Sequence, residues 1–436
     1  ICEGLVGSEM CIRDSSKLFS THRKNLCERL PHKALAISNA NDILPTNADG
    51  TLPIHPNSDL FYLSGIEQEE SILVLFPDCP KPEHREILFV REPSERLKIW
   101  EGYKHSQEDA RKISGIQTVF WTEDFDKVFQ LLAADAETFF LNDNEHSRAS
   151  NEVETRDQRF NKKIQRDYPL HKIDRLAPHL HELRFCKNPL EIKLIKHAVD
   201  VTAHGFRRVL SMMKPGIAEY EIEAEWAKEF IKRRCKFAYT PILASGGNAC
   251  VLHYLQNDQT CRKGQLILMD VGACYANYNA DLTRTIPVSG KFNRRQKQVY
   301  NAVLRVLRQC IENATIGKSL KEWQTDSHDM MTEEMLRLKL ITKGQVKKQD
   351  SDLPACRKYY MHGLGHSLGL DVHDVSNGQM EFRENSVFTV EPGIYLPDEG
   401  FGIRLEDDIQ ITKNGPINLM SNIPIEADEI EEIMNR

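Results

Sequence analysis

The sequence predicts an α/β (α+β) protein made of an N-terminal α/β domain and a larger C-terminal domain with two related halves. Strand-like and helical runs alternate over residues 17–174, and a polar stretch from Arg175 to Pro189 then interrupts the pattern. Beyond it, two long amphipathic helices are each followed by a similar segment, which indicates an internal repeat. We therefore expect domains at residues 17–176 and 177–436.

Composition places the chain among ordinary globular proteins. Its 436 residues suffice for two or three domains, and 40% hydrophobic with 28% charged residues is typical of such domains. With 57 basic and 64 acidic residues, the net charge of −7 argues against nucleic-acid binding. No apolar run is long enough to span a membrane. The 11 cysteines include no CxxC pair, so reduced thiols and a cytoplasmic location are expected.

The first 16 residues, ICEGLVGSEMCIRDSS, fit neither domain. They begin without Met, show no periodic pattern and contain no basic segment followed by an apolar one, so they are unlike a signal peptide. We expect residues 1–16 to be an extraneous or disordered tail.

The N-terminal domain alternates strand and helix candidates, which are recognised by apolar runs and by helical periodicity. The strand candidates are residues 71–76, 86–90 and 138–141, and the helix candidate is residues 124–133. In HPNSDLFYLSG, residues 55–65, Asp59 precedes an aromatic pair. We interpret this segment as the entry to a strand with buried rings.

Two long helices begin the halves of the C-terminal domain, the first of them near Pro189. Each repeats apolar residues at helical spacing and should pack one face on a core. These residues are Ile195, Ala198, Val199, Thr202, Phe206, Val209 and Met213 in the first helix, and Val299, Val303, Val306, Leu307, Cys310 and Ile311 in the second. Residues 214–230 and 315–331 follow these helices and share a Gly before an acidic and aromatic helix start. Two related halves would place a site at their junction.

The stretch LILMDVGACYANYNADLTRT, residues 266–285, places two aspartates among apolar residues. A buried strand that ends on Asp270 carries a charge that must be compensated. If Tyr275 and Ala276 form the turn of a hairpin, Asp270 lies directly opposite Asp281, about 5 Å away on the same face. Two facing carboxylates either share a proton or hold a cation.

Three stretches near the C-terminus supply further candidates. In MHGLGHSLGLDVHD, His362 and His366 have the i, i+4 spacing of a helical metal pair, but the intervening glycines disfavour a helix, so only one need be a ligand. In SVFTVEPGIYL, Glu391 ends a strand before a proline and should face a cleft. In FGIRLEDDIQIT, the pleat places Arg404 beside Glu406, where it can orient that carboxylate.

These acids outnumber the available cations. A lone aspartate or histidine is more often a cap, a turn residue or a salt-bridge partner than a metal ligand. Four carboxylates and one imidazole at the ends of apolar strands, however, describe an oxygen-rich site able to hold two divalent ions about 3.5 to 4 Å apart. Manganese (Mn2+) suits such a site best, zinc or cobalt could also bind, and the absence of thiolates from the set argues against a structural zinc site.

The motifs resemble those of the pita-bread metallopeptidases, and most closely those of the aminopeptidase P and prolidase branch. LILMDVGA with NADLTRT, MHGLGHSLGLDVHD, TVEPG and GIRLEDD occur in the family's order, and the resemblance covers nearly all of the chain beyond its first 16 residues. It implies a pita-bread fold for the C-terminal domain. It also implies that Asp270 binds one metal, that His366 and Glu391 bind the other, and that Asp281 and Glu406 bridge the two.

The same resemblance implies roles for four further residues. His253, in the LHY that follows ASGGNAC, matches the family's substrate-binding and proton-handling histidine. His373, in LDVHD, matches the histidine that contacts the substrate near the scissile bond. His362 resembles a supporting site residue, and Arg404 resembles a partner of the metal-binding carboxylates.

The expected reaction is removal of the first residue from peptides with proline at the second position, as in a Xaa-Pro aminopeptidase. Two divalent ions that share a water lower its pKa and provide a nucleophile at neutral pH, with Glu391 as the proton acceptor. The nucleophile attacks the carbonyl before proline, and His253 or His373 steadies the developing charge. We expect peptide substrates, no nucleic-acid or membrane partner, and a homo-oligomer, either a dimer or a tetramer.

Other functions stay open. Prolidase shares the metal ligands but cuts only dipeptides, and the short connection from Asp374 to Glu391 favours aminopeptidase P. Methionine aminopeptidase is disfavoured by the N-terminal domain of about 160 residues, and creatinase-like enzymes share the architecture without the ligands. A pita-bread protein that has become a binding module is disfavoured because all five ligands are present.

Overall fold

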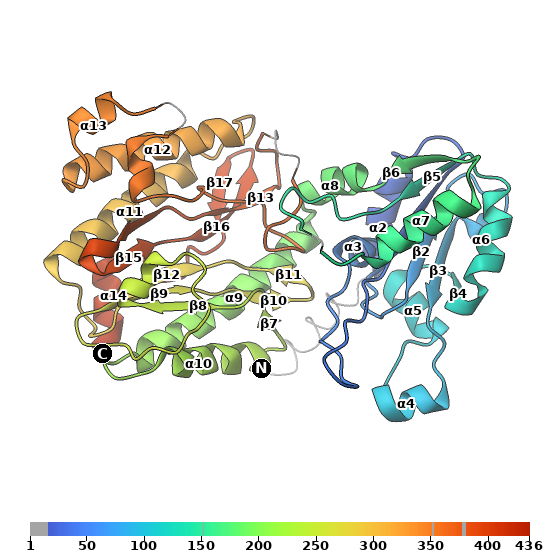
Figure 1. Cartoon of the computed structure of the whole chain (residues 1–436), viewed down its shortest axis with the longest axis horizontal. Coiled ribbons are helices and arrows are strands. Elements are labelled where there is room, and N and C mark those ends of the chain that lie inside the picture. The colour runs from blue at the N-terminus through green and yellow to red at the C-terminus, as the bar shows by residue number, and fades with distance from the viewer. Residues whose placement is uncertain (1–15, 151, 351–352, 377–380) are drawn as a thin grey trace. The chain divides into compact units, whose positions relative to one another are not determined.

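The computed structural model describes residues 16–150, 152–350, 353–376 and 381–436, so the predicted N-terminal tail lies, apart from its last residue, outside the described residues. The chain divides into two compact units, one ending at Arg184 and the other spanning Phe185–Arg436 (Figure 1). No helix in the described ranges has both the length and the apolar character needed to cross a bilayer.

One six-stranded sheet organises the N-terminal unit, with strand order β4-β3-β2-β1-β5-β6. The strands are β1 (Ala34–Asn39), β2 (Ile72–Leu75), β3 (Glu86–Val90), β4 (Thr118–Trp121), β5 (Thr138–Leu141) and β6 (Lys172–Arg175). The helices are α2 (Ser16–Cys27), α3 (Ser58–Ser64), α4 (Glu95–Glu101), α5 (Gln107–Ser114), α6 (Phe125–Ala133), α7 (Arg156–Asp167) and α8 (Ala177–Phe185), with 3-10 turns η1 (Pro82–His84) and η2 (Thr122–Asp124). The predicted strands and the predicted helix of this unit are confirmed to within two residues.

The sheet of this unit is mixed. Strand β1 pairs in parallel with β5 and antiparallel with β2, so the unit is an α/β domain with an antiparallel pair at its centre. Apolar side chains from both strands and helices form its core, including Leu35, Ile37, Val74, Phe89, Phe129 and Phe139. Both faces of β1 are buried, which explains its nearly continuous apolar sequence.

Within residues 55–65, Ser58–Ser64 form the helix α3, so the predicted strand entry was wrong. Asn57 caps α3 by accepting two backbone N–H groups, and Gly65 ends it with φ 71°. The two aromatic rings of this segment are buried, as expected. A side-chain cap followed by a terminal glycine is a helix signal, and here it outweighs the strand preference of the aromatic residues.

The described residues of the C-terminal unit form four small sheets, with strand orders β12-β9-β8, β11-β10-β7, β13-β16-β17 and β14-β15. Its strands are β7 (Lys236–Phe237), β8 (Ile242–Ser245), β9 (Leu266–Asp270), β10 (Ala273–Tyr275), β11 (Tyr278–Asn279), β12 (Thr283–Pro287), β13 (Val387–Val390), β14 (Gly393–Leu396), β15 (Phe401–Arg404), β16 (Asp407–Thr412) and β17 (Gly415–Asn418). Its helices are α9 (Pro189–Met212), α10 (Glu219–Lys232), α11 (Arg294–Glu312), α12 (Leu320–Arg337), α13 (Lys343–Lys347) and α14 (Ala427–Met434), with 3-10 turns η3 (Gly246–Cys250), η4 (Ala355–Lys358) and η5 (Pro397–Glu399).

The two predicted long helices are α9 and α11, and a shorter helix follows each of them (Figure 1). Asn188 caps α9 and Pro189 occupies its first turn, which is why the helix begins there. The predicted apolar faces are buried except at their last positions, Met213 and Ile311, which are half-buried. Each half therefore contains a long helix packed on its core and then a second helix, α10 or α12.

The hairpin that carries the two aspartates has a different register from the one predicted. Tyr275 pairs with Tyr278, so the turn is formed by Ala276 and Asn277, with φ values of 47° and 65°. Such a turn needs two left-handed residues, and asparagine adopts that conformation more readily than tyrosine. The turn therefore moves by one residue, and the partner of Asp270 becomes Thr283.

Candidate metal centre

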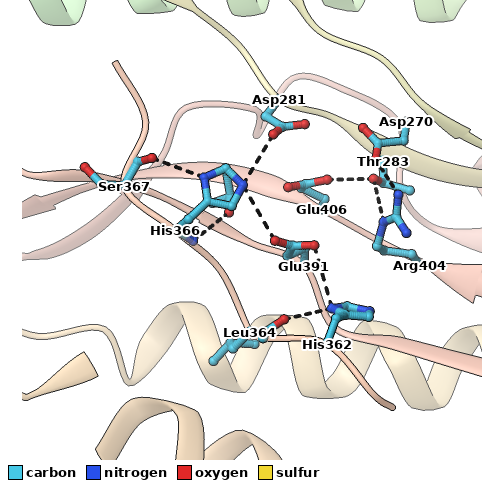
Figure 2. A network of polar contacts seen from close by, with 12 residues as sticks. Asp270, Asp281, Thr283, His362, Leu364, His366, Ser367, Glu391, Arg404 and Glu406 are labelled. Carbon is cyan, nitrogen blue, oxygen red and sulfur yellow. Dashed lines mark hydrogen bonds and ion pairs between the residues drawn. The ribbon is translucent and has the colours of Figure 1, made fainter. Parts of the chain in front are cut away.

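Four carboxylates converge at strand ends around one cavity of about 440 Å³. Asp270 ends β9, and Asp281 lies two residues before β12. In the second half of the unit, Glu391 directly follows β13 and Glu406 directly precedes β16. A bridge between Thr283 and Glu406 joins the two halves here, and Figure 2 shows the four acidic side chains grouped together.

His366 directs one ring nitrogen toward these acids (Figure 2). Its Nε2 lies 3.5 Å from an oxygen of Asp281 and 3.7 Å from an oxygen of Glu391. Its Nδ1 lies 3.1 Å from the carbonyl oxygen of Ser367. Because a carbonyl can only accept, Nδ1 carries the hydrogen, and the lone pair of Nε2 faces the carboxylates as it does in a metal ligand.

The donor atoms are spaced as a cation site requires. Asp281, His366 and Glu406 can each offer one ligand atom, all within 4.8 Å of one another. Asp270 and Glu391 add two more carboxylates to the same cavity. A set of oxygens with a single imidazole nitrogen fits hard or borderline divalent ions such as manganese, and the number of carboxylates is enough for two ions.

The site is short of positive charge. Among the described residues that line the cavity, Arg404 supplies the only guanidinium or ammonium group. Burial raises the pKa of Asp281 well above its usual value, and the charge of Asp270 adds to this effect. Burial, followed by the charge of Asp281, likewise raises the pKa of Glu406. Divalent ions would supply the charge that keeps these carboxylates ionised.

Arg404 binds Asp270 directly and reaches Glu406 only through Thr283. Its Nη2 makes a short ion pair with Asp270, and its Nε donates to Thr283 Oγ1 at 3.1 Å. Thr283 Oγ1 in turn donates to an oxygen of Glu406 at 2.6 Å. The expected direct contact is replaced by this link because β15 ends at Arg404 and β16 begins at Asp407, so no continuous strand carries both side chains.

His362 stands beside Glu391 as a neutral imidazole. Its Nδ1 lies 2.8 Å from the carbonyl oxygen of Gly363, and its Nε2 lies 2.8 Å from the hydroxyl of Tyr395. Nδ1 therefore holds the hydrogen, and Nε2 accepts one from the tyrosine. Burial, followed by the charge of Arg404, lowers the pKa of His362 to about 3. The Nδ1 of His362 lies 3.8 Å from Oε2 of Glu391. As expected, no helix connects His362 to His366.

His253 and His373 line the same cavity from two loops. The ring centroid of His373 lies 4.1 Å from that of His366. His253 lies beyond η3 and is exposed. All nine residues singled out from the sequence therefore line one cavity.

Tyr239 is a site residue that the sequence did not indicate. Its hydroxyl lies 2.5 Å from an oxygen of Asp270 and 2.5 Å from an oxygen of Asp281, so it can donate to either. Burial, reinforced by the charge of Asp270, raises its pKa well above the usual value, which keeps the hydrogen in place. No spacing rule links Tyr239 to aspartates so far along the chain. Thr283, by contrast, lies two residues after Asp281, and strand alternation could have identified it.

An acid-rich cavity of this kind is typical of a metal-dependent hydrolase, and comparison with known proteins defines the class. The pattern of metallopeptidase family M24 matches residues 193–413, and the pattern of the aminopeptidase P N-terminal domain matches residues 19–140. The chain belongs to metallopeptidase family M24 and carries the N-terminal domain of aminopeptidase P.

Individual relatives match almost from end to end. The Xaa-Pro aminopeptidase of Escherichia coli K12 is 33% identical, over 96% of this chain and 98% of its own. The zinc-substituted aminopeptidase P of E. coli in complex with product is 30% identical, covers 97% of this chain and 98% of its own, and superposes with a TM-score of 0.86. A Bacillus anthracis structure assigned to aminopeptidase P is 34% identical, with coverages of 96% and 98% and a TM-score of 0.89.

Proposed function

We propose that this metallopeptidase is a Xaa-Pro aminopeptidase, which removes the first residue from peptides with proline at the second position. The observation that carries the proposal is the convergence of four carboxylates and His366 on one cavity in which, among the described residues, Arg404 is the only permanent cation. The similarity to the E. coli Xaa-Pro aminopeptidase supports it, because it extends over 96% of the chain and so includes both units.

The proposed metal ligands are the five acidic and imidazole groups described above, namely Asp270, Asp281, His366, Glu391 and Glu406. When bound there, two divalent ions would polarise the substrate carbonyl and make a water molecule nucleophilic at neutral pH. We propose manganese as the native metal because carboxylate oxygens dominate the donor set.

The chain's own residues would handle the proton and hold the peptide. The side chain of Glu391 is 20% exposed, against 7% for Asp281, so it is the acid better placed to accept a proton inside the cavity. His253 and His373 line the cavity and can donate hydrogen bonds to the peptide carbonyl as charge develops on it. Arg404 would hold Asp270 in place. The two histidines, and not Arg404, would contact the substrate.

The distribution of positive charge favours an aminopeptidase over a dipeptidase. A dipeptidase must capture the free carboxylate of proline, and a bidentate arginine suits that task best. Arg404 is already engaged by Asp270, Thr283 and Tyr395. No other guanidinium or ammonium group lines the described part of the cavity.

The test compares two substrates on the manganese-loaded enzyme. We expect a Xaa-Pro-Xaa tripeptide to be cut after its first residue with a kcat/KM at least equal to that of the matching Xaa-Pro dipeptide. Rapid hydrolysis of the dipeptide with no cut in the tripeptide would instead establish a prolidase. Metal binding without hydrolysis of either peptide would indicate a binding module.

We also propose a cytoplasmic location and assembly as a dimer or tetramer. Cys261 and Cys310 are buried thiols outside any disulfide, and burial raises the pKa of each to about 12. Unreactive reduced thiols suit a reducing compartment. Cell fractionation tests the location, and light scattering tests the assembly.

A further inference from the structure

Glu219, the first residue of α10, is a buried carboxylate outside the cavity described above. Its side chain is fully buried, and it accepts three hydrogen bonds, all from neutral donors. The backbone N–H of Ser245 donates to Oε1 at 2.7 Å, while the hydroxyl of Tyr254 and the backbone N–H of Gln259 donate to Oε2 at 2.9 Å and 3.0 Å. Burying a carboxylate without a paired cation is unfavourable, so this arrangement calls for an explanation beyond packing.

Two of the donors, Ser245 and Gln259, flank one segment, residues 246–258, which we name the His253 loop, and the third donor lies within it. Ser245 ends β8 just before the loop, and Gln259 follows the loop directly. The backbone N–H of Glu219 also donates to the carbonyl of Gln259 at 2.9 Å. Tyr254, the third donor, is the residue next to His253. The carboxylate of Glu219 thus accepts hydrogen bonds from residues at both ends of the loop and from Tyr254, the neighbour of His253.

The opposite side of the loop forms part of the cavity wall. Leu252, His253 and Leu255 line the cavity, and Leu255 is 51% exposed. His253 is exposed as well. His253 thus lies on the cavity side of a loop whose buried side contacts Glu219.

We propose that Glu219 is a positioning residue, which acts through Tyr254 and the two loop ends to fix His253 over the substrate. This inference rests on the function proposed above, because it gives His253 a peptide to contact. Only a carboxylate suits the position: three donors meet there, and a glutamine would direct an NH₂ group at one of them. Burial and the hydrogen bond to Glu219 raise the pKa of Tyr254, so its hydroxyl keeps its hydrogen.

The experiment uses the full-length, manganese-loaded protein with two variants, Glu219→Gln and Tyr254→Phe. Glu225→Gln is the matched control, because Glu225 lies on the same helix but pairs with Arg208 and Lys228 at the surface. We expect Glu219→Gln to lower kcat/KM for the tripeptide at least about tenfold through displacement of the histidine. Tyr254→Phe removes only one of the three hydrogen bonds, so it should lower kcat/KM about threefold. Metal content should stay unchanged in all three variants, and the control should match the wild type.

A double-mutant cycle with His253→Ala separates positioning from general destabilisation. If Glu219 acts through His253, Glu219→Gln should cost less than about twofold once the histidine is absent. Equal fold-losses with and without the histidine would overturn the proposal.

Hydrogen exchange supplies a readout that does not depend on activity. Exchange should accelerate in residues 246–258 of Glu219→Gln and Tyr254→Phe, and stay unchanged there in Glu225→Gln. Unchanged exchange in the loop of both variants would overturn the proposal even if the enzyme is active. If the wild type fails to cut the tripeptide, the proposed function fails, and the hydrogen-exchange result alone then decides whether Glu219 holds the loop.

Discussion

Two buried acidic clusters, one in each unit, differ in how their charge is balanced. In the N-terminal unit, Asp59 accepts a hydrogen bond from Arg184 at 2.7 Å and another from Asn142 at 3.0 Å. One carboxylate meets one guanidinium, and the cluster needs no ion. In the candidate metal centre, four carboxylates share a single permanent cation, Arg404, among the described residues of the cavity.

Asp157, in the N-terminal unit, shows how a buried acid whose hydrogen bond comes from a neutral side chain is accommodated. It accepts a hydrogen bond from Asn39 at 2.8 Å, and burial raises its pKa to about 7. A single acid can hold a proton at little further cost. Four acids in one cavity, with an imidazole among them, can bind divalent ions instead. The excess of carboxylates over cations, and not burial alone, therefore distinguishes the candidate metal centre from the structural cluster.

Removing the divalent ions should have the largest effect on activity. It should affect the acids of the candidate metal centre and leave the Asp59 cluster unchanged. We expect the purified protein to bind about two divalent ions per chain. Chelation should abolish hydrolysis of the tripeptide, and manganese should restore it. Metal analysis and activity before and after chelation measure this effect. Fewer than one ion per chain under saturating manganese would contradict the assignment of the site.

Changing one acid in each cluster should separate their roles. Glu391→Gln keeps the shape of the side chain but removes the proton acceptor, so kcat should fall at least about a hundredfold with the fold intact. The control is Asp59→Asn, which breaks the balanced cluster. It should lower the free energy of unfolding by about 3 kcal/mol and leave kcat within about twofold. A Glu391→Gln protein that binds metal and turns over normally would refute the role of Glu391.

Tyr239→Phe should have a smaller effect, because Tyr239 orients ligands without being one of them. Loss of the hydroxyl shared by Asp270 and Asp281 should weaken manganese binding about tenfold. Isothermal titration calorimetry of the chelator-treated protein measures this affinity. An unchanged affinity would mean that Arg404 and the strands suffice to orient the aspartates.

The smallest effect, confined to stability, should come from the pH response of Asp157. Its pKa rises from 3.8 to about 7 in the folded state, so folding favours the protonated carboxyl. The resulting stabilisation is complete below about pH 4 and is lost as the pH rises toward 7. Asp157→Asn should remove this dependence. Urea unfolding of both proteins at pH 5 and pH 7.5, in the presence of manganese, provides the measurement, and identical pH slopes would contradict the prediction.

The sequence alone determined the elements and the acids that end them. The apolar faces of α9 and α11 follow from helical spacing, and β3 and β5 follow from their apolar runs, because these patterns depend on neighbours only a few residues apart. The metal-centre acids stood out for the same local reason, since each is a charge at the end of an apolar run. The wrong prediction of a strand entry at α3 also has a local cause. The asparagine cap and the terminal glycine that mark this helix lie within nine residues of each other.

The tertiary structure alone decided the contacts between these elements. The left-handed turn at Ala276 and Asn277 shifted the partner of Asp270 to Thr283, and the break between β15 and β16 directed Arg404 to Asp270. Tyr239 contacts two aspartates, and Glu219 binds the His253 loop. Both contacts join segments of the chain that no sequence periodicity relates. Spacing along a chain reports which face a side chain occupies, whereas the partner on that face depends on turns and strand breaks that accumulate over the whole fold.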